Sequence, residues 1–446
     1  MPPKVAKGPR AALLWEAFFV LLIVLGVIHT AWFLIVQGYL PQPYFYGSQS
    51  LFTDWTVSAY FAVNKGAYTA FQSVYPPLSF VFLKIFSIGR CYKAYDDIFA
   101  SRECDWMAPL VLGAFFVLNI YLVYKSYRIN DPPTAWMRTI AICFGLPCFY
   151  ALERGNLILP TFTFFILGQS RLLKSAWMKW LSMAIAINFK PYLILAIVGH
   201  IFRRQWRWFE GCAIFGLIVY LVTYALNRDG DPIQLLSNIS AFSTTDPQGI
   251  FQRAIYASGY RPIVDLLHSS FPLMHFMGSR PIEIMERALP LAINVGKLGI
   301  IVCFAGTILR PGVVPVTRLA ALGIAWVLTA EDPGGYAVLF FFYLVLMERW
   351  RGVLMITALV ITYISSISYD YIVLRISHEI ILSRLTNRAA GYDLGVNVGE
   401  LARPALTIII EYALVVKSLV DIGRALAARS PAPAPPPASL EVVRGV

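Results

Sequence analysis

Asp54 is a residue of this chain that could do acid–base chemistry. It follows the first long apolar stretch and precedes Tyr75-Pro76-Pro77. A carboxylate held beside aromatic rings at the edge of a cleft can act as a general base. A solvated loop acid is the commoner fate of such a residue, and spacing alone does not separate the two interpretations.

Two further stretches carry cations that could meet an anion. Residues 153–156 read Glu-Arg-Gly-Asn, and Lys190 is followed by proline between two apolar runs. Glu153 and Arg154 can pair with each other at a membrane surface, or the planar guanidinium of Arg154 can bind phosphate. The ammonium of Lys190 either faces a polar cavity or an anion, or extends to the lipid head groups.

The elements that position these residues are predicted to be membrane-spanning helices. The 446 residues are 58% hydrophobic and only 14% charged, too few polar residues to cover a water-soluble globule of this size. The first apolar stretch, about 13–36, follows three basic residues and lacks a small-residue cleavage site, so it is predicted to be a retained helix. Further spans are predicted at about 107–124, 136–152, 157–170, 175–188, 191–202, 208–226, 288–309, 316–330, 336–347, 353–371 and 403–423.

This pattern predicts an all-α polytopic membrane protein of about twelve transmembrane helices with long outer loops. Residues 76–88 are apolar but only about 13 residues long, so we expect a re-entrant or interfacial segment there. The Pro/Ala-rich residues 430–446 are predicted to form a disordered cytoplasmic tail, which leaves 1–429 as one transmembrane domain.

The distribution of charge predicts which helix ends face the cytosol. Twenty Lys and Arg residues, against six acidic ones, fall at the two termini and in alternate connections. Nearly all other acids lie in the three long segments 37–106, 227–287 and 372–402. The excess of basic residues places both termini in the cytosol and the long segments outside. The net charge is +12, but the Lys and Arg residues are scattered over short connections and form no continuous basic stripe, so no nucleic-acid partner is predicted.

Helix length suggests where the polar residues lie. Four of the predicted spans have only about 12–14 apolar residues, so each rises about 18–21 Å against a hydrocarbon core of about 30 Å. If the shortfall is on the outer side, Arg154, Asn156 and Lys190 lie below the head groups. A lipid phosphate could then enter from the side while a polar acceptor arrives from water.

Cysteine and histidine usage bears on redox state and metals. Cys91 and Cys104 lie in the first outer segment, where an oxidising environment allows a disulfide between them. The other four cysteines fall within predicted spans, as small packing residues. The five histidines show no metal-ligand spacing, and no nucleotide-binding loop is present, so neither a metal nor a cofactor is predicted.

The ordered polar residues resemble those of glycosyltransferase family 87 of the C-type superfamily, which includes polyprenyl-phosphomannose-dependent mannosyltransferases. The likeness covers the first half by residues and the rest by topology. It rests on Asp54, Gly66, Tyr75-Pro76-Pro77, Arg154-Gly155-Asn156, Lys190-Pro191 and Arg203-Arg204-Gln205-Trp206-Arg207.

The resemblance implies a C-type glycosyltransferase-like bundle in the bacterial inner (plasma) membrane, with its active site facing the periplasm. Such an enzyme moves a mannose-like hexose from a polyprenyl-phosphate carrier to a glycan or glycolipid acceptor and inverts the anomeric centre. Asp54 corresponds to the general base. Arg154, Asn156 and Lys190 are the expected ligands of the donor phosphate.

The late outer helix end departs from the family pattern. Where the family often has a Ser-Pro-x-x-Trp-x-His-Tyr-like stretch, residues 329–336 keep only the tyrosine, and Gly335 stands at the histidine position. Lys190, His378 or an arginine of the segment 372–402 can substitute for that imidazole. The residues expected to meet the acceptor or the sugar are Tyr75, Glu153, Glu331, Asp332 and Tyr336.

Two other classes of function are compatible with this chain. A transporter or flippase of a lipid-linked sugar would also carry charges in its helices, but no repeat symmetry is visible and the charges gather on one face. A glycan polymerase or ligase would use the same kind of donor, so only donor and acceptor assays separate it. Sugar, acceptor, linkage and oligomeric state are not legible in the sequence.

Overall fold

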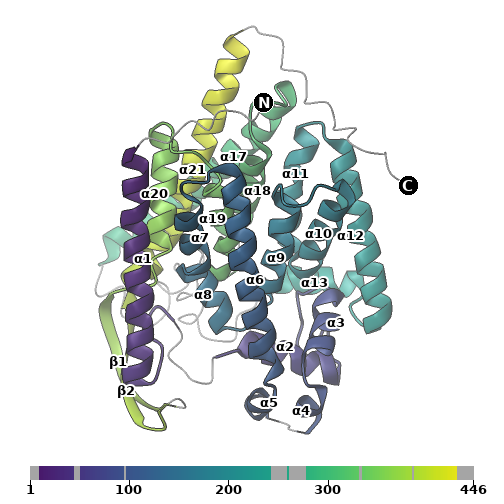
Figure 1. Cartoon of the computed structure of the whole chain (residues 1–446), viewed down its shortest axis with the longest axis vertical. Coiled ribbons are helices and arrows are strands. Elements are labelled where there is room, and N and C mark those ends of the chain that lie inside the picture. The colour runs from purple at the N-terminus through teal and green to yellow at the C-terminus, as the bar shows by residue number, and fades with distance from the viewer. Residues whose placement is uncertain are drawn as a thin grey trace.

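The protein is a bundle of helices with one antiparallel two-stranded sheet (Figure 1). The computed structural model describes residues 10–44, 51–94, 97–242, 259–260, 278–330, 334–383 and 386–428. Glu331, Asp332 and the predicted tail 430–446 lie outside the described residues.

The helices of the first half follow one another closely along the chain. They are α1 (Arg10–Gln37), α2 (Thr53–Asn64), α3 (Pro77–Phe86), α4 (Gly89–Ala94), α5 (Ile98–Cys104), α6 (Met107–Asn130), α7 (Ala135–Cys143), α8 (Leu146–Glu153), α9 (Ile158–Gln169), α10 (Ala176–Phe189), the 3₁₀ helix η2 (Pro191–Ile194), α11 (Leu195–Phe202) and α12 (Trp206–Asn227).

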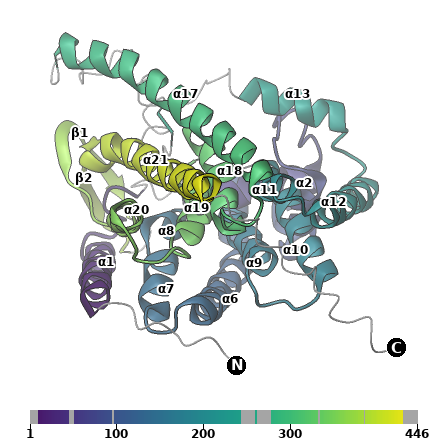
Figure 2. The ribbon, with the colours of Figure 1, turned by 90° about the horizontal axis from the view of Figure 1, so that it is seen from above.

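The second half contains the longest helix and the hairpin. Its elements are α13 (Pro232–Phe242), α17 (Ser279–Leu309), α18 (Val316–Ala330), the 3₁₀ helix η3 (Gly335–Ala337), α19 (Val338–Val345), α20 (Val353–Ser365), β1 (Ile372–Leu382), β2 (Ala389–Asn397) and α21 (Val398–Ala427). Figure 2 shows α21 in the middle of this half, where it packs against α17, α18 and α20.

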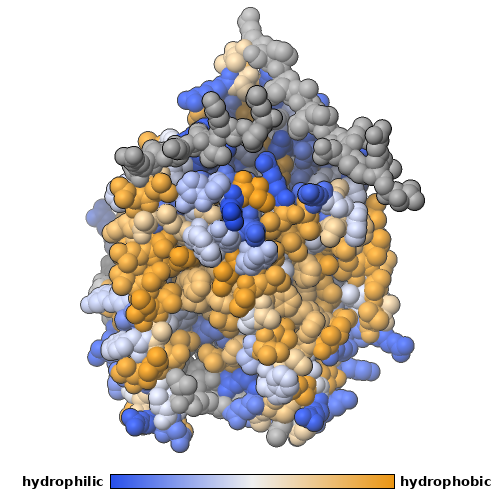
Figure 3. Space-filling model, viewed as in Figure 1, coloured by the Kyte–Doolittle hydropathy of each residue, from blue (hydrophilic) through white to orange (hydrophobic). Residues whose placement is uncertain are grey.

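Length and composition make this a multi-pass membrane protein. Within the described residues, five helical stretches are long and apolar enough to cross a bilayer, namely Ala12–Gln37, Met107–Asn130, Ala135–Glu153, Trp206–Asn227 and Ser279–Leu309. Large apolar side chains on their surfaces, such as Leu21, Leu110 and Ile214, are exposed. Figure 3 shows an apolar belt between two more polar ends of the molecule, as expected for a surface that faces lipid tails.

Most of the predicted spans coincide with helices, and one ends early. The predicted span 136–152 corresponds to the stretch Ala135–Glu153, in which a short break separates α7 from α8, because Pro147 in the first turn of α8 cannot continue the hydrogen-bond ladder of α7. The predicted span 353–371 ends at Ser365 with α20. The count of about twelve spans stays a prediction.

The segment after α20 was expected to be a loop of an all-α protein and instead forms a β-hairpin. Its strands β1 and β2 pair antiparallel, with Arg375 opposite Gly395 and His378 opposite Asp393. Many strand-favouring residues stand in β1, including Ile372, Val373 and Ile380. The fold is therefore mostly helical with one small sheet.

The apolar segment 76–88 contains the short helix α3, which packs against α2, α10 and α12. Its ten residues rise about 15 Å, roughly half of a hydrocarbon core. This length agrees with a segment that does not cross the membrane by itself.

The basic connections meet one another at the end of the bundle opposite α2 and the hairpin (Figure 1). Arg203 after α11 donates to the carbonyl of Pro311 at 2.9 Å, which joins two of these connections. Arg318 bonds Glu348 at 2.7 Å and Asp421 at 3.0 Å. These contacts join several of the basic connections at one end of the bundle.

Candidate functional site

Asp54 lies in the first turn of α2, directly beside the segment that follows α8. The backbone N–H of Phe52 donates to the carbonyl of Glu153 at 2.8 Å, and that of Asp54 donates to the carbonyl of Arg154 at 3.0 Å. Two stretches that are about a hundred residues apart in sequence are thus joined backbone to backbone. The start of α2 is held against the end of α8.

The carboxylate of Asp54 accepts three side-chain hydrogen bonds. Arg154 donates to Oδ1 from Nε at 3.1 Å and from Nη2 at 2.8 Å, while Asn156 donates to Oδ2 at 2.6 Å. The side chains of Asp54 and Arg154 are 17% and 19% exposed. The pair is desolvated on most sides but still reachable, as a binding site requires.

The turn between Arg154 and Asn156 depends on a glycine. Gly155 has φ +64°, and a Cβ there would lie 2.8 Å from Cδ1 and 3.0 Å from Cα of Phe52. A side chain at this position would both strain the backbone and push α2 away. Asn156 accepts the backbone N–H of Ile158 at 3.0 Å and so also begins α9.

Lys190 stands at the junction of α10 and η2 and is only 4% exposed. Its ammonium lies 4.3 Å from the ring centroid of Tyr75 and 5.6 Å from that of Tyr336. Within the described residues no carboxylate forms an ion pair with it, which leaves its three N–H donors to ring faces. Burial lowers the pKa of Lys190 to about 7, and the charge of Asp54 opposes this shift.

Tyr75 lies under the ammonium of Lys190, and the charge of Asp54 acts on its hydroxyl. The carbonyl of Tyr75 accepts the Tyr68 hydroxyl at 2.7 Å, and its N–H donates to Ser73 Oγ at 3.0 Å, so the backbone at this residue is fixed. Burial, then the charge of Asp54, raise the pKa of the Tyr75 hydroxyl, which stays protonated at neutral pH. The hydroxyl of Tyr75 can therefore donate a hydrogen bond to an incoming ligand.

The remaining predicted residues have mixed placements. Tyr336 lies in η3, beside Lys190, and packs against Tyr44 and Tyr150. Glu153 is buried at the end of α8. His378 lies on the hairpin, where its Nδ1 is 2.9 Å from Asp393 Oδ1.

Two polar groupings were missed by sequence reasoning. Arg403 in α21 pairs with Asp370 and donates to the Tyr150 hydroxyl at 3.1 Å, one helical turn before Arg154. Asp105, directly after α5, is 1% exposed and accepts three hydrogen bonds. Only its place beside Cys104 could have drawn attention to Asp105.

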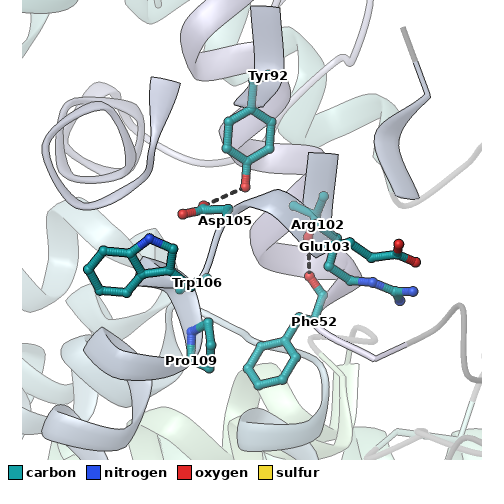
Figure 4. A pocket seen from close by; sticks show the side chains of 9 residues that line it. Phe52, Tyr92, Arg102, Glu103, Asp105, Trp106 and Pro109 are labelled. Atoms are coloured by element: carbon teal, nitrogen blue, oxygen red, sulfur yellow. Dashed lines mark hydrogen bonds between the residues drawn. The ribbon is translucent and has the colours of Figure 1, made fainter. Parts of the chain in front are cut away.

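Segment 37–106 contains the predicted disulfide between Cys91 and Cys104, which joins α4 to α5. Beside it lies a cavity of about 280 Å³, lined by residues of α2, α4, α5 and α6 and of the turns next to them (Figure 4). Phe52 and Thr56 line this cavity, whereas Asp54 points to Arg154 on the other side of α2. The cavity and the Asp54 carboxylate are therefore on opposite faces of one helix turn.

Among the described residues no group of three or more His, Cys, Asp or Glu side chains could hold a metal ion. The site consists of one carboxylate, two cations, an amide and two tyrosines. Comparisons of the chain with protein-family models, with curated proteins and with solved structures find no match.

Proposed function

We propose that this protein is an integral-membrane glycosyltransferase that moves a hexose from a polyprenyl-phosphate carrier to a hydroxyl of a glycan or glycolipid, with inversion. One observation carries the proposal. Asp54, Arg154 and Asn156 are in direct contact, and Lys190 is held beside them by the rings of Tyr75 and Tyr336. A base and a set of phosphate ligands thus share one site.

The reaction needs both kinds of group. The acceptor oxygen forms a bond to the anomeric carbon as the bond from that carbon to the phosphate oxygen breaks. The proton of the acceptor hydroxyl goes to the Asp54 carboxylate, and the electron pair of the broken bond leaves with the polyprenyl phosphate. Cations near the leaving oxygen stabilise the charge that grows there.

Arg154 has a double part in this proposal. In the structure its fork is turned to Asp54, which shields the carboxylate from an acceptor hydroxyl. A phosphate that entered the site would compete for the same fork, because guanidinium binds phosphate and carboxylate in the same planar geometry. Donor binding would then free an oxygen of Asp54 for the acceptor.

Lys190 provides the second cation. Its ammonium lies over the rings of Tyr75 and Tyr336, which cannot replace the hydrogen bonds to water that burial removes. A phosphate oxygen would therefore be a better partner. An anion would also raise the pKa of Lys190 back toward its ordinary value. The proposed donor site is therefore electrostatically incomplete until the lipid phosphate arrives.

The finer features of the family resemblance belong to the same proposal. They are a bundle of about twelve spans of the C-type kind, a bacterial inner-membrane location, cytoplasmic termini and a site open to the periplasm. The accumulation of basic residues at the end of the bundle opposite Asp54 supports this orientation.

The decisive experiment compares purified wild-type protein and Asp54→Asn in lipid vesicles, with polyprenyl-phosphate mannose and candidate glycan or glycolipid acceptors. We expect the variant to bind donor but to transfer sugar at least ~100-fold more slowly, since a general base contributes about that factor. Asp393→Asn is a matched control, because Asp393 also pairs with an arginine, Arg375, at 2.7 Å but lies on the hairpin.

Three outcomes would overturn the proposal. Full activity of Asp54→Asn would remove the carboxylate from the chemistry. Movement of the lipid-linked sugar between leaflets without a new glycosidic bond would assign a flippase. Transfer of whole glycans but no single hexose would assign a polymerase or ligase.

A further inference from the structure

A disulfide-bonded segment, called the cap below, is hydrogen-bonded to α2, the helix that carries Asp54. This cap comprises α4, α5 and Asp105, with the bond between Cys91 and Cys104 joining the two helices. Two residues of the cap that touch α2 follow these cysteines directly: Tyr92 follows Cys91, and Asp105 follows Cys104.

Asp105 is a residue of the cap that accepts three hydrogen bonds. Its Oδ2 accepts the indole N–H of Trp55 at 3.3 Å and the hydroxyl of Tyr92 at 2.7 Å, as Figure 4 shows for Tyr92. Its Oδ1 accepts the backbone N–H of Ile88 at 3.1 Å. A carboxylate that is 1% exposed and meets three donors is held firmly, because each lost bond would leave a buried polar group unpaired.

The cap holds α2 at both ends as well. Arg102 of the cap donates to the carbonyl of Leu51 at 2.9 Å, just before α2. Asn64, the last residue of α2, donates to the carbonyl of Tyr92 at 2.8 Å. Together with the bond from Trp55, these contacts fix α2 at its start, in its first turn and at its end.

Packing alone does not fix the first turn of α2. Phe52 and Thr56 border the cavity of about 280 Å³, so one face of the turn is not filled by side chains. On the opposite face Asp54 makes its contacts with Arg154 and Asn156. Trp55, which is fully buried, lies next to Asp54 in sequence and reaches across to Asp105.

We infer that Asp105 is a positioning residue for Asp54, that it acts through Trp55, and that the Cys91–Cys104 disulfide keeps it in place. This inference rests on the proposed transferase function. A small rotation of the first turn would move the carboxylate relative to the acceptor hydroxyl, and a misplacement of about 1 Å can slow a reaction about 100-fold.

The test is a double-mutant cycle on sugar transfer. Asp105→Asn replaces one acceptor oxygen by an NH₂ group, so the side chain can no longer accept from all three of its donors, and Trp55→Phe removes the indole N–H but keeps a ring. We expect each variant to lower kcat about 10–100-fold while KM for the lipid donor changes less than about threefold. The double variant should be no slower than the slower single variant, because both weaken the contact between Trp55 and Asp105.

A control separates positioning from general loss of packing. Ser126→Ala removes an equally buried hydrogen bond, 2.7 Å to the Tyr343 hydroxyl, that involves no residue of α2. It should keep kcat within about twofold of wild type. Multiplicative losses in the double variant, a change confined to donor KM, or an equal loss in Ser126→Ala would each overturn the inference.

A second measurement does not depend on activity. Amide hydrogen exchange should become at least ~10-fold faster in the first turn of α2 in Asp105→Asn and in the Cys91→Ser/Cys104→Ser variant, while α9 stays unchanged. Unchanged exchange in α2 would refute the positioning role. If wild-type protein transfers no sugar but the exchange effect appears, the proposed function fails while the mechanical part of the inference stands.

Discussion

Nε and Nη2 of Arg154 donate to the same oxygen, Oδ1, of Asp54, at 3.1 and 2.8 Å. The other oxygen, Oδ2, receives Asn156 at 2.6 Å. Both oxygens of the Asp54 carboxylate are therefore already hydrogen-bonded, and the donors are the residues proposed to bind the donor phosphate. In the proposed mechanism this arrangement couples the base to phosphate binding. An anion that binds Arg154 in place of Asp54 would leave Oδ1 of Asp54 free to accept a proton.

Arg154→Lys tests the importance of the fork. The substitution keeps the charge but loses the planar pair of donors, so we expect kcat/KM to fall about 10–100-fold, equivalent to about 1.5–3 kcal/mol for a charged hydrogen bond. Steady-state kinetics with varied lipid donor would measure it. Arg375→Lys changes the matched exposed pair on the hairpin and should leave kinetics unaltered. Equal effects of both substitutions would contradict a special role for Arg154.

The pH dependence of donor binding tests Lys190. Its folded-state pKa of about 7 lies below the ordinary value, so the ammonium is present below pH 7 and is lost as pH rises above it. Asp54, Tyr75 and Tyr336 are the groups that face it, and Tyr75 stays neutral because its own pKa is raised. We therefore expect KM for the lipid donor to increase between pH 6 and pH 8.5.

Lys190→Met supplies the comparison for that experiment. Without an ammonium, KM for the donor should be high and nearly constant over the same pH range. A wild-type KM that does not change with pH, or a variant that follows the wild-type curve, would show that Lys190 does not meet the phosphate.

Gly155→Ala tests the turn that joins the two halves of the site. The positive φ and the contact with Phe52 should together cost about 1–3 kcal/mol and displace Arg154 from Asp54. Both the thermal unfolding temperature in detergent and the transfer activity should decrease. Gly113→Ala in α6 is the control, since nothing lies within 4 Å of its added methyl group, and it should be neutral or stabilising. Wild-type activity in Gly155→Ala would show that the turn tolerates a side chain.

Arg138→Met tests the ion pair between α7 and α1 at the other end of the bundle. Arg138 and Glu16 are almost fully buried and 3.0 Å apart, with the Tyr363 hydroxyl donating to Glu16 at 2.8 Å. Removal of the arginine leaves a buried carboxylate without its cation and should destabilise the protein by about 3–5 kcal/mol. The unfolding temperature of the double variant Glu16→Leu/Arg138→Met should lie between those of Arg138→Met and of the wild type. A double variant less stable than Arg138→Met would contradict this explanation.

The amino-acid sequence determined the helical membrane character and the place of many helices. Apolar runs such as 157–170 and 175–188 coincide with α9 and α10 to within about a residue, because backbone polar groups in lipid must be satisfied within the helix itself. The position of Lys190 between two apolar runs singled it out, since an ionisable residue there needs a polar cavity, an anion or the lipid head groups. The pairing of Cys91 with Cys104 was accessible from compartment and proximity in the chain.

Only the tertiary structure decided which charges meet. Arg154 could have paired with its neighbour Glu153, yet its fork is directed to Asp54, about a hundred residues earlier, because α2 docks backbone to backbone against the end of α8. The bond from Trp55 to Asp105 likewise depends on how the disulfide cap packs on α2. Such contacts depend on the relative placement of whole helices, which many weak packing interactions determine jointly, whereas residue type and spacing act only locally.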